Sequence, residues 1–395
     1  MNTLFIIGNG FDLAHGLKTR YEDFILSLIK KDLLELISIF KEIPQTNFDL
    51  KSTNITLSSS PDLVISFLEK FTPTIESISD LKRNVGQFKH ITHLRFKNLV
   101  LQRIWKSHKS PNWSDIEWQY FQTLVGIVNP PKSSPLTDQT IHLENQLIKL
   151  NEDIDEIAQE LNDYLKEISE NFIPDLSLIE KYNKILLEHL GGNNLILNFN
   201  YTSVLSHCPT ANQFDMINIH GILGQYSPLI IGYGDEATSL YKKLENQNNF
   251  EFLRHTKSSR YAENDNYHKV HSFINRWTKP ISMIEQENIN SGITMSPNYV
   301  PLSEVPYEVV ILGHSCGLSD RVLLKEILEN NNCEKVHVYY YNDKKGNTDF
   351  LHTVSNISRH FDNKVHMRSK VQSLKLKYRM PQWDDEPESK NATST

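Results

Sequence analysis

LFIIGNGFD (residues 4–12) is the stretch of this 395-residue chain that best indicates its fold. The four apolar residues predict a short buried strand, and Gly8 and Gly10 predict a tight turn directly after it. A strand, a glycine turn and a helix in this order are typical of Rossmann-like proteins, where the turn and the helix N-terminus hold a phosphate. The alternative is an ordinary turn in which Asp12 caps the following helix.

The rest of the chain alternates between helical and strand-like patterns in a way that fits an α/β fold. Further short apolar runs predict strands at 195–199, 216–219, 229–231, 308–312 and 336–341. Between the first strand and these runs, apolar residues recur at helical spacing, and the clearest example is 143–168. That helix could form the seam of a homo-oligomer or, as we favour, one arm of an internal helical hairpin.

We therefore predict a Rossmann-like, mostly parallel sheet with a large helical insertion after its first strand. The predicted parts are a nucleotide-binding core at 1–20 and 190–345, a helical insertion at 21–189, a second insertion or lid at 235–303, and a disordered tail at 380–395.

Composition excludes several classes of protein. Hydrophobic residues make up 39% of the chain, as in a globular protein, and the formal net charge of −7 disfavours sequence-independent binding of nucleic acid. The three cysteines form no CxxC pair, and His268-x-x-His271 has no further ligand at metal spacing, so we expect no bound metal. With no signal peptide and no apolar run of membrane length, we expect a cytoplasmic protein with reduced thiols and no membrane partner.

Four further turns with polar or glycine residues follow predicted strands. They are Asn198–Thr202, His220-Gly221, Gly232–Asp235 and Gly313–Gly317. In a parallel sheet such turns gather at the carboxyl edge, where ligands bind. Each also has a structural interpretation: an asparagine that starts a turn, a histidine that is part of the core, and Ser319 or Asp320 as the cap of the next helix.

WSDIEW (residues 113–118) is a separate motif inside the helical insertion. Asp115 and Glu117 are candidate site residues that could face the cleft. The alternative is a capping box, in which Ser114 and Glu117 satisfy the start of a helix.

Taken in order, these blocks resemble the bacteriophage abortive infection family AbiH. The matching stretches are LFIIGNGFDLAHGLKTRYEDF, WSDIE, LNFNYT, INIHG, IIGYGD and ILGHSCGLSDR, which together span residues 3 to 341. AbiH proteins are in turn similar to SIR2-like domains of the NAD-binding Rossmann type. The resemblance implies a phage-defence protein, and it adds NAD as the ligand and a phage-derived trigger as a partner.

The same resemblance implies roles for individual residues. His220 would be the catalytic base, Asn200 would orient the ribose or the attacking water, and Asp12 would hold the ribose hydroxyls. The residues implied to bind the cofactor are Gly8, Asn9, Gly10, Phe11, Asp12, Gly221, Gly232, Gly313, His314 and Ser315, with Thr202 and Asp320 as further candidates. Because the four cysteines of the sirtuin zinc module have no counterpart, the implied activity is hydrolysis of NAD rather than protein deacetylation.

Two other functions stay open at this point. The fold could bind a nucleotide signal without chemistry and act as a sensor or interaction module. Alternatively, Asp115 and Glu117 with Asp12 or Asp235 could gather Mg²⁺ in a nuclease.

Overall fold

The computed structural model describes most of the chain and divides it into two compact units. The described residues are 1–42, 55–56, 66, 68–87, 95–106, 113–128, 139–224, 229–234, 239–246, 249–275, 277–278, 303–343 and 345–385. Unit 1 comprises Met1–Gly16, Ile173–Ile222 and Tyr261–Thr395, and unit 2 comprises Leu17–Phe172 and Leu223–Arg260.

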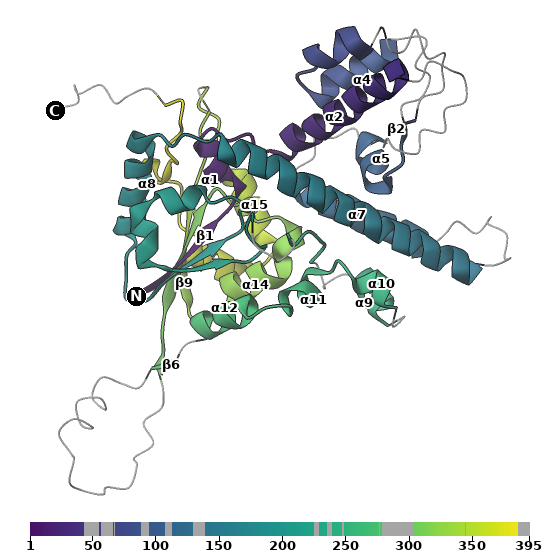
Figure 1. The fold of residues 1–395 in the computed structure, drawn as a ribbon. Helices are drawn as coiled ribbons and strands as arrows, with labels where there is room; N and C mark the ends of the chain where they lie inside the picture. Colours follow the sequence, from purple (N-terminus) through teal and green to yellow (C-terminus); the bar gives the residue numbers. More distant parts are fainter. Residues whose placement is uncertain are drawn as a thin grey trace, which may run out of the picture. The chain divides into compact units, whose positions relative to one another are not determined.

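Unit 1 is built on a sheet of five parallel strands in the order β5-β4-β1-β8-β9. Strands β1 and β9 of this sheet are labelled in Figure 1. The strands are β1 (Asn2–Ile7), β4 (Asn194–Asn198), β5 (Asp215–Asn218), β8 (Tyr307–Leu312) and β9 (Cys333–Tyr339). Every residue of the central strand β1 is buried, which explains why Leu4–Ile7 form a continuous apolar run rather than an alternating pattern. The predicted α/β fold with a parallel sheet is confirmed.

The strands end together, and this alignment positions the site. Ile7 at the end of β1 lies opposite Asn198 of β4 on one side and Leu312 of β8 on the other. The residues that follow these strands therefore emerge side by side at the carboxyl edge of the sheet.

The remaining elements of unit 1 cover and extend the sheet. They are α1 (Asn9–Ala14), α8 (Leu176–Glu188), η2 (Val204–His207), η3 (Pro209–Gln213), α12 (Asn266–Ile274), β6 (Trp277–Thr278), β7 (Ser303–Glu304), η4 (Leu318–Asp320), α14 (Arg321–Glu329), α15 (Phe350–Ser358), α16 (Lys364–Lys370) and η5 (Leu376–Tyr378). Of the predicted tail, Met380 is buried and the Trp383 amide donates to the Ala14 carbonyl at 2.8 Å. Residues 386–395 lie outside the described residues.

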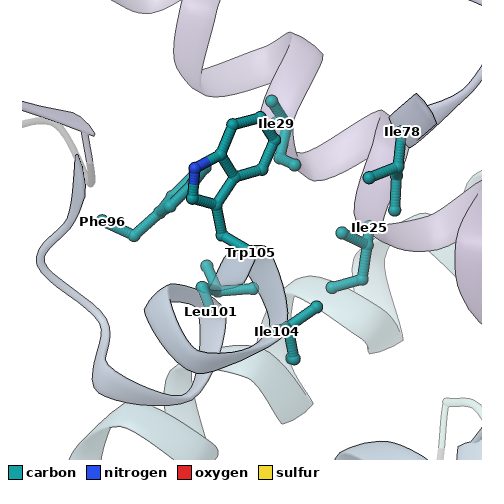
Figure 2. A pocket seen from close by; sticks show the side chains of 7 residues that line it. All are labelled: Ile25, Ile29, Ile78, Phe96, Leu101, Ile104 and Trp105. Atoms are coloured by element: carbon teal, nitrogen blue, oxygen red, sulfur yellow. The ribbon is translucent and has the colours of Figure 1, made fainter. Parts of the chain in front are cut away.

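Unit 2 contains the helices inserted after the first strand. Its elements are α2 (Tyr21–Glu42), β2 (Ile55–Thr56), η1 (Thr72–Thr74), α4 (Ile78–Gln87), β3 (Arg95–Phe96), α5 (Leu99–Lys106), α6 (Trp113–Val128), α7 (Gln139–Glu170), α9 (Ser239–Glu245), α10 (Phe250–Leu253) and α11 (Lys257–Tyr261), which ends at the boundary with unit 1. The long helix predicted around 143–168 is α7, and its apolar stripe is buried against α2, α5 and α6. A small apolar pocket between α2, α4, β3 and α5 is lined by Ile25, Ile29, Ile78, Phe96, Leu101, Ile104 and Trp105 (Figure 2).

One predicted strand is wrong. Leu229–Ile231 is buried but belongs to no strand, and the nearest pairing is a single bridge between Tyr233 and Thr256. A short buried apolar run has the same composition whether or not its backbone joins a sheet, so the pattern could not decide this point. Of the predicted second insertion, 235–238, 247–248, 276 and 279–302 lie outside the described residues.

No helix in the described part of the chain combines the length and the apolar character needed to cross a membrane.

Candidate functional site at the carboxyl edge of the sheet

The order of the strands defines a topological switch point between β1 and β8. From β1 the chain moves to β4 and β5 on one side, and it then returns to β8 and β9 on the other. In open α/β sheets, ligands bind outside the carboxyl ends of the strands at such a point. The loops that border it here are Gly8–Gly10 and Gly313–Cys316.

Glycines let these two loops touch each other. A Cβ on Gly8 would lie 2.6 Å from the Cα of His314, and one on Gly10 would lie 2.7 Å from the Cα of Gly313. Gly313 has a φ of +68°, and Cys316 in the same loop has a φ of +52°, which is uncommon for a residue with a side chain.

The amides of the first loop are used inside the protein. Gly8 donates to the Leu312 carbonyl at 3.0 Å, Gly10 to the Gly313 carbonyl at 2.7 Å, and Phe11 to the Gly8 carbonyl at 2.8 Å. These three donors, which we expected to meet a phosphate, are satisfied by loop packing. The close contact between the two loops is thus sufficient to account for glycine at positions 8 and 10.

Asp12 is a buried carboxyl group beneath the first loop. It is the fourth residue of α1, whose N-cap is Gly8, so it does not cap that helix. It accepts a hydrogen bond from Thr202 Oγ1 at 2.6 Å and another from Asn200 Nδ2 at 3.0 Å. Burial raises the pKa of Asp12 to about 7, although the hydrogen bonds from Thr202 and Asn200 act to lower it. Among the described residues, no Lys, Arg or His side chain forms an ion pair with Asp12.

The Asn200 amide is oriented by its own hydrogen bonds. Its two Nδ2 hydrogens are used by Asp12 and by the Gly8 carbonyl at 3.1 Å, and its backbone amide donates to Asn198 Oδ1 at 3.1 Å. The side-chain oxygen Oδ1 is consequently the part of Asn200 that can meet a ligand, and it can only accept.

His220 lies beside a second carboxylate, Asp320. Its Nε2 is 3.2 Å from Asp320 Oδ1 and 3.1 Å from the hydroxyl of Tyr261. The other oxygen of Asp320 lies 3.6 Å from Nε2 of His314, and the ring of Phe199 contacts both imidazoles. His220 is thus connected to the first glycine turn through Asp320 and His314, whose side chain contacts Gly8.

The side chain of Asp320 is not used as a helix cap. Asp320 occupies the N-cap position of α14 but makes no side-chain capping hydrogen bond. Because this carboxylate faces two histidines instead, the capping interpretation does not account for it.

Several other predicted residues border the same edge. Gly221 has a φ of +88°, Ser315 is exposed, and Asn9 is half-buried. Phe11 is buried, and its ring packs against His15 and Tyr182.

Glu117 and Gly232 belong to unit 2, whereas the residues described above belong to unit 1. Glu117 is almost fully buried, pairs with the buried Lys257 at 3.0 Å and accepts from the Gly232 amide at 3.2 Å. Helix α6 already begins at Trp113, so Ser114 is not its N-cap. The side chain of Asp115 and all of Asp235 lie outside the described residues.

Two features of unit 1 leave no signal in the sequence. Tyr261 gave no signal because it follows no strand. Within the described part of the chain, one group of side chains has the chemistry and proximity to hold a metal, namely His189, Glu308 and His337. Their separation along the chain leaves no spacing motif.

Comparisons with known proteins give a single result. Neither a search of curated proteins nor a search of solved structures returned a match. The profile of a family described as "Bacteriophage abortive infection AbiH" matches residues 4–342, which include both loops of the switch point, Asp12, Asn200, His220 and Asp320. This chain therefore belongs to the bacteriophage abortive infection family AbiH.

Proposed function

We propose that this AbiH protein binds NAD at the carboxyl edge of the unit 1 sheet and hydrolyses the bond between nicotinamide and ribose. Membership of the family supports a role in phage abortive infection. The resemblance of its motifs to SIR2-like domains supports NAD as the ligand, and the switch point between β1 and β8 supports the carboxyl edge as its site.

The observation that carries this proposal is the buried carboxyl group of Asp12. A buried carboxylate with hydrogen bonds but no cation partner destabilises the fold at neutral pH. Groups whose pKa is displaced in this way cluster at functional sites. Asp12 lies at the switch point and fixes the amide of Asn200, so we assign it as a positioning residue.

Asn200 would contact the substrate directly. With both Nδ2 hydrogens used, its Oδ1 can accept a hydrogen bond from a ribose hydroxyl or from the attacking water. Asp12 and the Gly8 carbonyl hold that oxygen in one orientation, which reduces the entropy lost when the substrate is positioned.

His220 would be the general base. We assign the Nε2 hydrogen of His220 to Asp320 Oδ1, which leaves the lone pair on Nδ1. Water attacks C1′ of the ribose, and the C1′–N bond breaks with its electron pair going to the pyridine ring. Nicotinamide then leaves as a neutral base without a general acid. The proton of the water passes to His220 and then to solvent.

Nicotinamide release from NAD by the purified full-length protein tests this function. His220→Ala is expected to lower turnover about 10²–10⁴-fold, the usual contribution of a general base. His366→Ala, an exposed histidine of unit 1, is the matched control and should behave as the wild type. Equal turnover in wild type and His220→Ala would contradict the role of His220, and a tight complex with unprocessed NAD would identify a sensor instead.

A further inference from the structure

A second polar cluster of unit 1 joins three distant segments on one face of the sheet. His189 is the C-cap residue of α8, Glu308 is the second residue of β8, and His337 lies in β9. Nδ1 of His189 is 2.9 Å from Oε1 of Glu308, and Nε2 of His337 is 3.2 Å from Oε2. Each imidazole therefore meets its own oxygen of one carboxylate.

Two tyrosines hold the far nitrogens of these imidazoles. The hydroxyl of Tyr339 lies 3.1 Å from Nε2 of His189, and that of Tyr378 lies 2.9 Å from Nδ1 of His337. Histidines that bind metals usually donate their second N–H to such an oxygen, which fixes the ring and directs the other nitrogen at the metal.

The cluster is partly open to solvent. The three side chains are 9%, 14% and 10% exposed, so an ion can reach the cluster from solvent.

We propose that His189 Nδ1, Glu308 and His337 Nε2 bind one Zn²⁺ ion, with water as the fourth ligand. Two nitrogens and one carboxylate oxygen suit zinc rather than Mg²⁺ or Ca²⁺, which prefer oxygen ligands. The ligand atoms lie within 4.8 Å of one another. In a tetrahedral site, two ligand atoms about 2.1 Å from the metal lie about 3.4 Å apart, so side-chain rotations that shorten the present separations would complete the site.

The ion would connect the end of α8 to β8 and β9 and so stabilise unit 1. This inference is independent of the proposed function, because Glu308 lies near the start of its strand and the switch point lies at the strand ends. A failure to bind zinc would not contradict the proposal about NAD, and a failure to bind or hydrolyse NAD would not contradict the proposed zinc site.

Zinc binding to the full-length protein, after treatment with a chelator, tests the proposal. Isothermal titration with Zn²⁺ is expected to show one site per chain of micromolar affinity or tighter, and Co²⁺ should give the visible absorption of a tetrahedral nitrogen and oxygen site. Glu308→Gln and His337→Ala should each weaken binding about 10-fold or more, whereas the exposed-histidine control His366→Ala should bind as the wild type does.

Equal zinc affinity in wild type and both cluster variants would overturn the proposal, since the ion would then bind elsewhere. If a variant fails to fold, the measurements on the wild type still test the proposal. A Co²⁺ complex of the wild type without tetrahedral absorption, or a Zn²⁺ titration of the wild type without one site per chain, would also overturn the proposal.

Discussion

Replacement of Asp12 by asparagine should stabilise unit 1 at neutral and alkaline pH. The pKa of Asp12 rises from an ordinary value of 3.8 to about 7 in the fold. The folded state therefore binds the proton more tightly than the unfolded state does, and the free energy of unfolding falls as pH rises between these values. The shift in pKa corresponds to a loss of about 4 kcal/mol in the free energy of unfolding, and this loss is fully present above about pH 7.

Asparagine is a close mimic of the protonated acid. Its oxygen can accept from Asn200, and its amide can donate to the Thr202 hydroxyl, so both hydrogen bonds of Asp12 are kept in number. The variant has no carboxyl group to titrate at position 12. The difference in free energy of unfolding between the variant and the wild type should therefore grow by about 2.5 kcal/mol, in favour of the variant, between pH 5 and pH 8. The same variant should release nicotinamide more slowly, because stability gained at a functional carboxylate commonly reduces activity.

Urea denaturation of both proteins at the two pH values, followed by circular dichroism, measures this difference. Asp215→Asn, which changes an exposed aspartate of the same unit, is the control and should show no growing advantage. An Asp12→Asn protein that is less stable than the wild type at pH 8, or whose offset does not change with pH, would refute the reasoning about Asp12.

Three further predictions concern other parts of the structure. Gly313→Ala should lower the melting temperature more than Gly346→Ala does. Both glycines have a positive φ, but only a Cβ at Gly313 would clash with the backbone, at 2.3 Å from the Phe11 nitrogen. Equal effects would mean that the contact between the two loops does not contribute to stability. Lys257→Met should lower the free energy of unfolding of unit 2 by about 3–5 kcal/mol, because it leaves Glu117 buried and unpaired. Adding Glu117→Gln should restore part of that stability in thermal or urea denaturation, and no restoration would argue against a buried ion pair. Asp320→Asn should lower kcat for NAD while changing KM little, and it should alter the pH profile of turnover, because the carboxylate no longer fixes the tautomer of His220. An unchanged pH profile would argue against this role of Asp320.

The sequence was most informative where a pattern is local. The apolar run of β1, the heptad-like stripe of α7 and the strand–glycine order predicted the parallel sheet and the helices inserted after its first strand, because burial and periodicity act over a few residues. The same logic failed at 229–231, where burial was predicted correctly and strand pairing was not.

The site was predictable only in outline. The rule that parallel strands end at one edge suggested a shared cleft for Asp12, Asn200, His220 and His314. All four belong to unit 1, but the rule could not say which atoms meet. Glycines that we expected to approach a phosphate are also required by the contact between the two loops, which the sequence did not predict. The cluster of His189, Glu308 and His337 depends on strand register, which no sequence spacing reveals.

Calorimetric titration of NAD into the His220→Ala protein separates binding from turnover and therefore tests for the dinucleotide site itself. We expect one NAD per chain, with binding weakened at least 10-fold when Asn200 is also changed to alanine, since Asn200 Oδ1 would contact the ribose. Absence of NAD binding, or binding unaffected by the change at Asn200, would contradict a dinucleotide site at the carboxyl edge of this sheet.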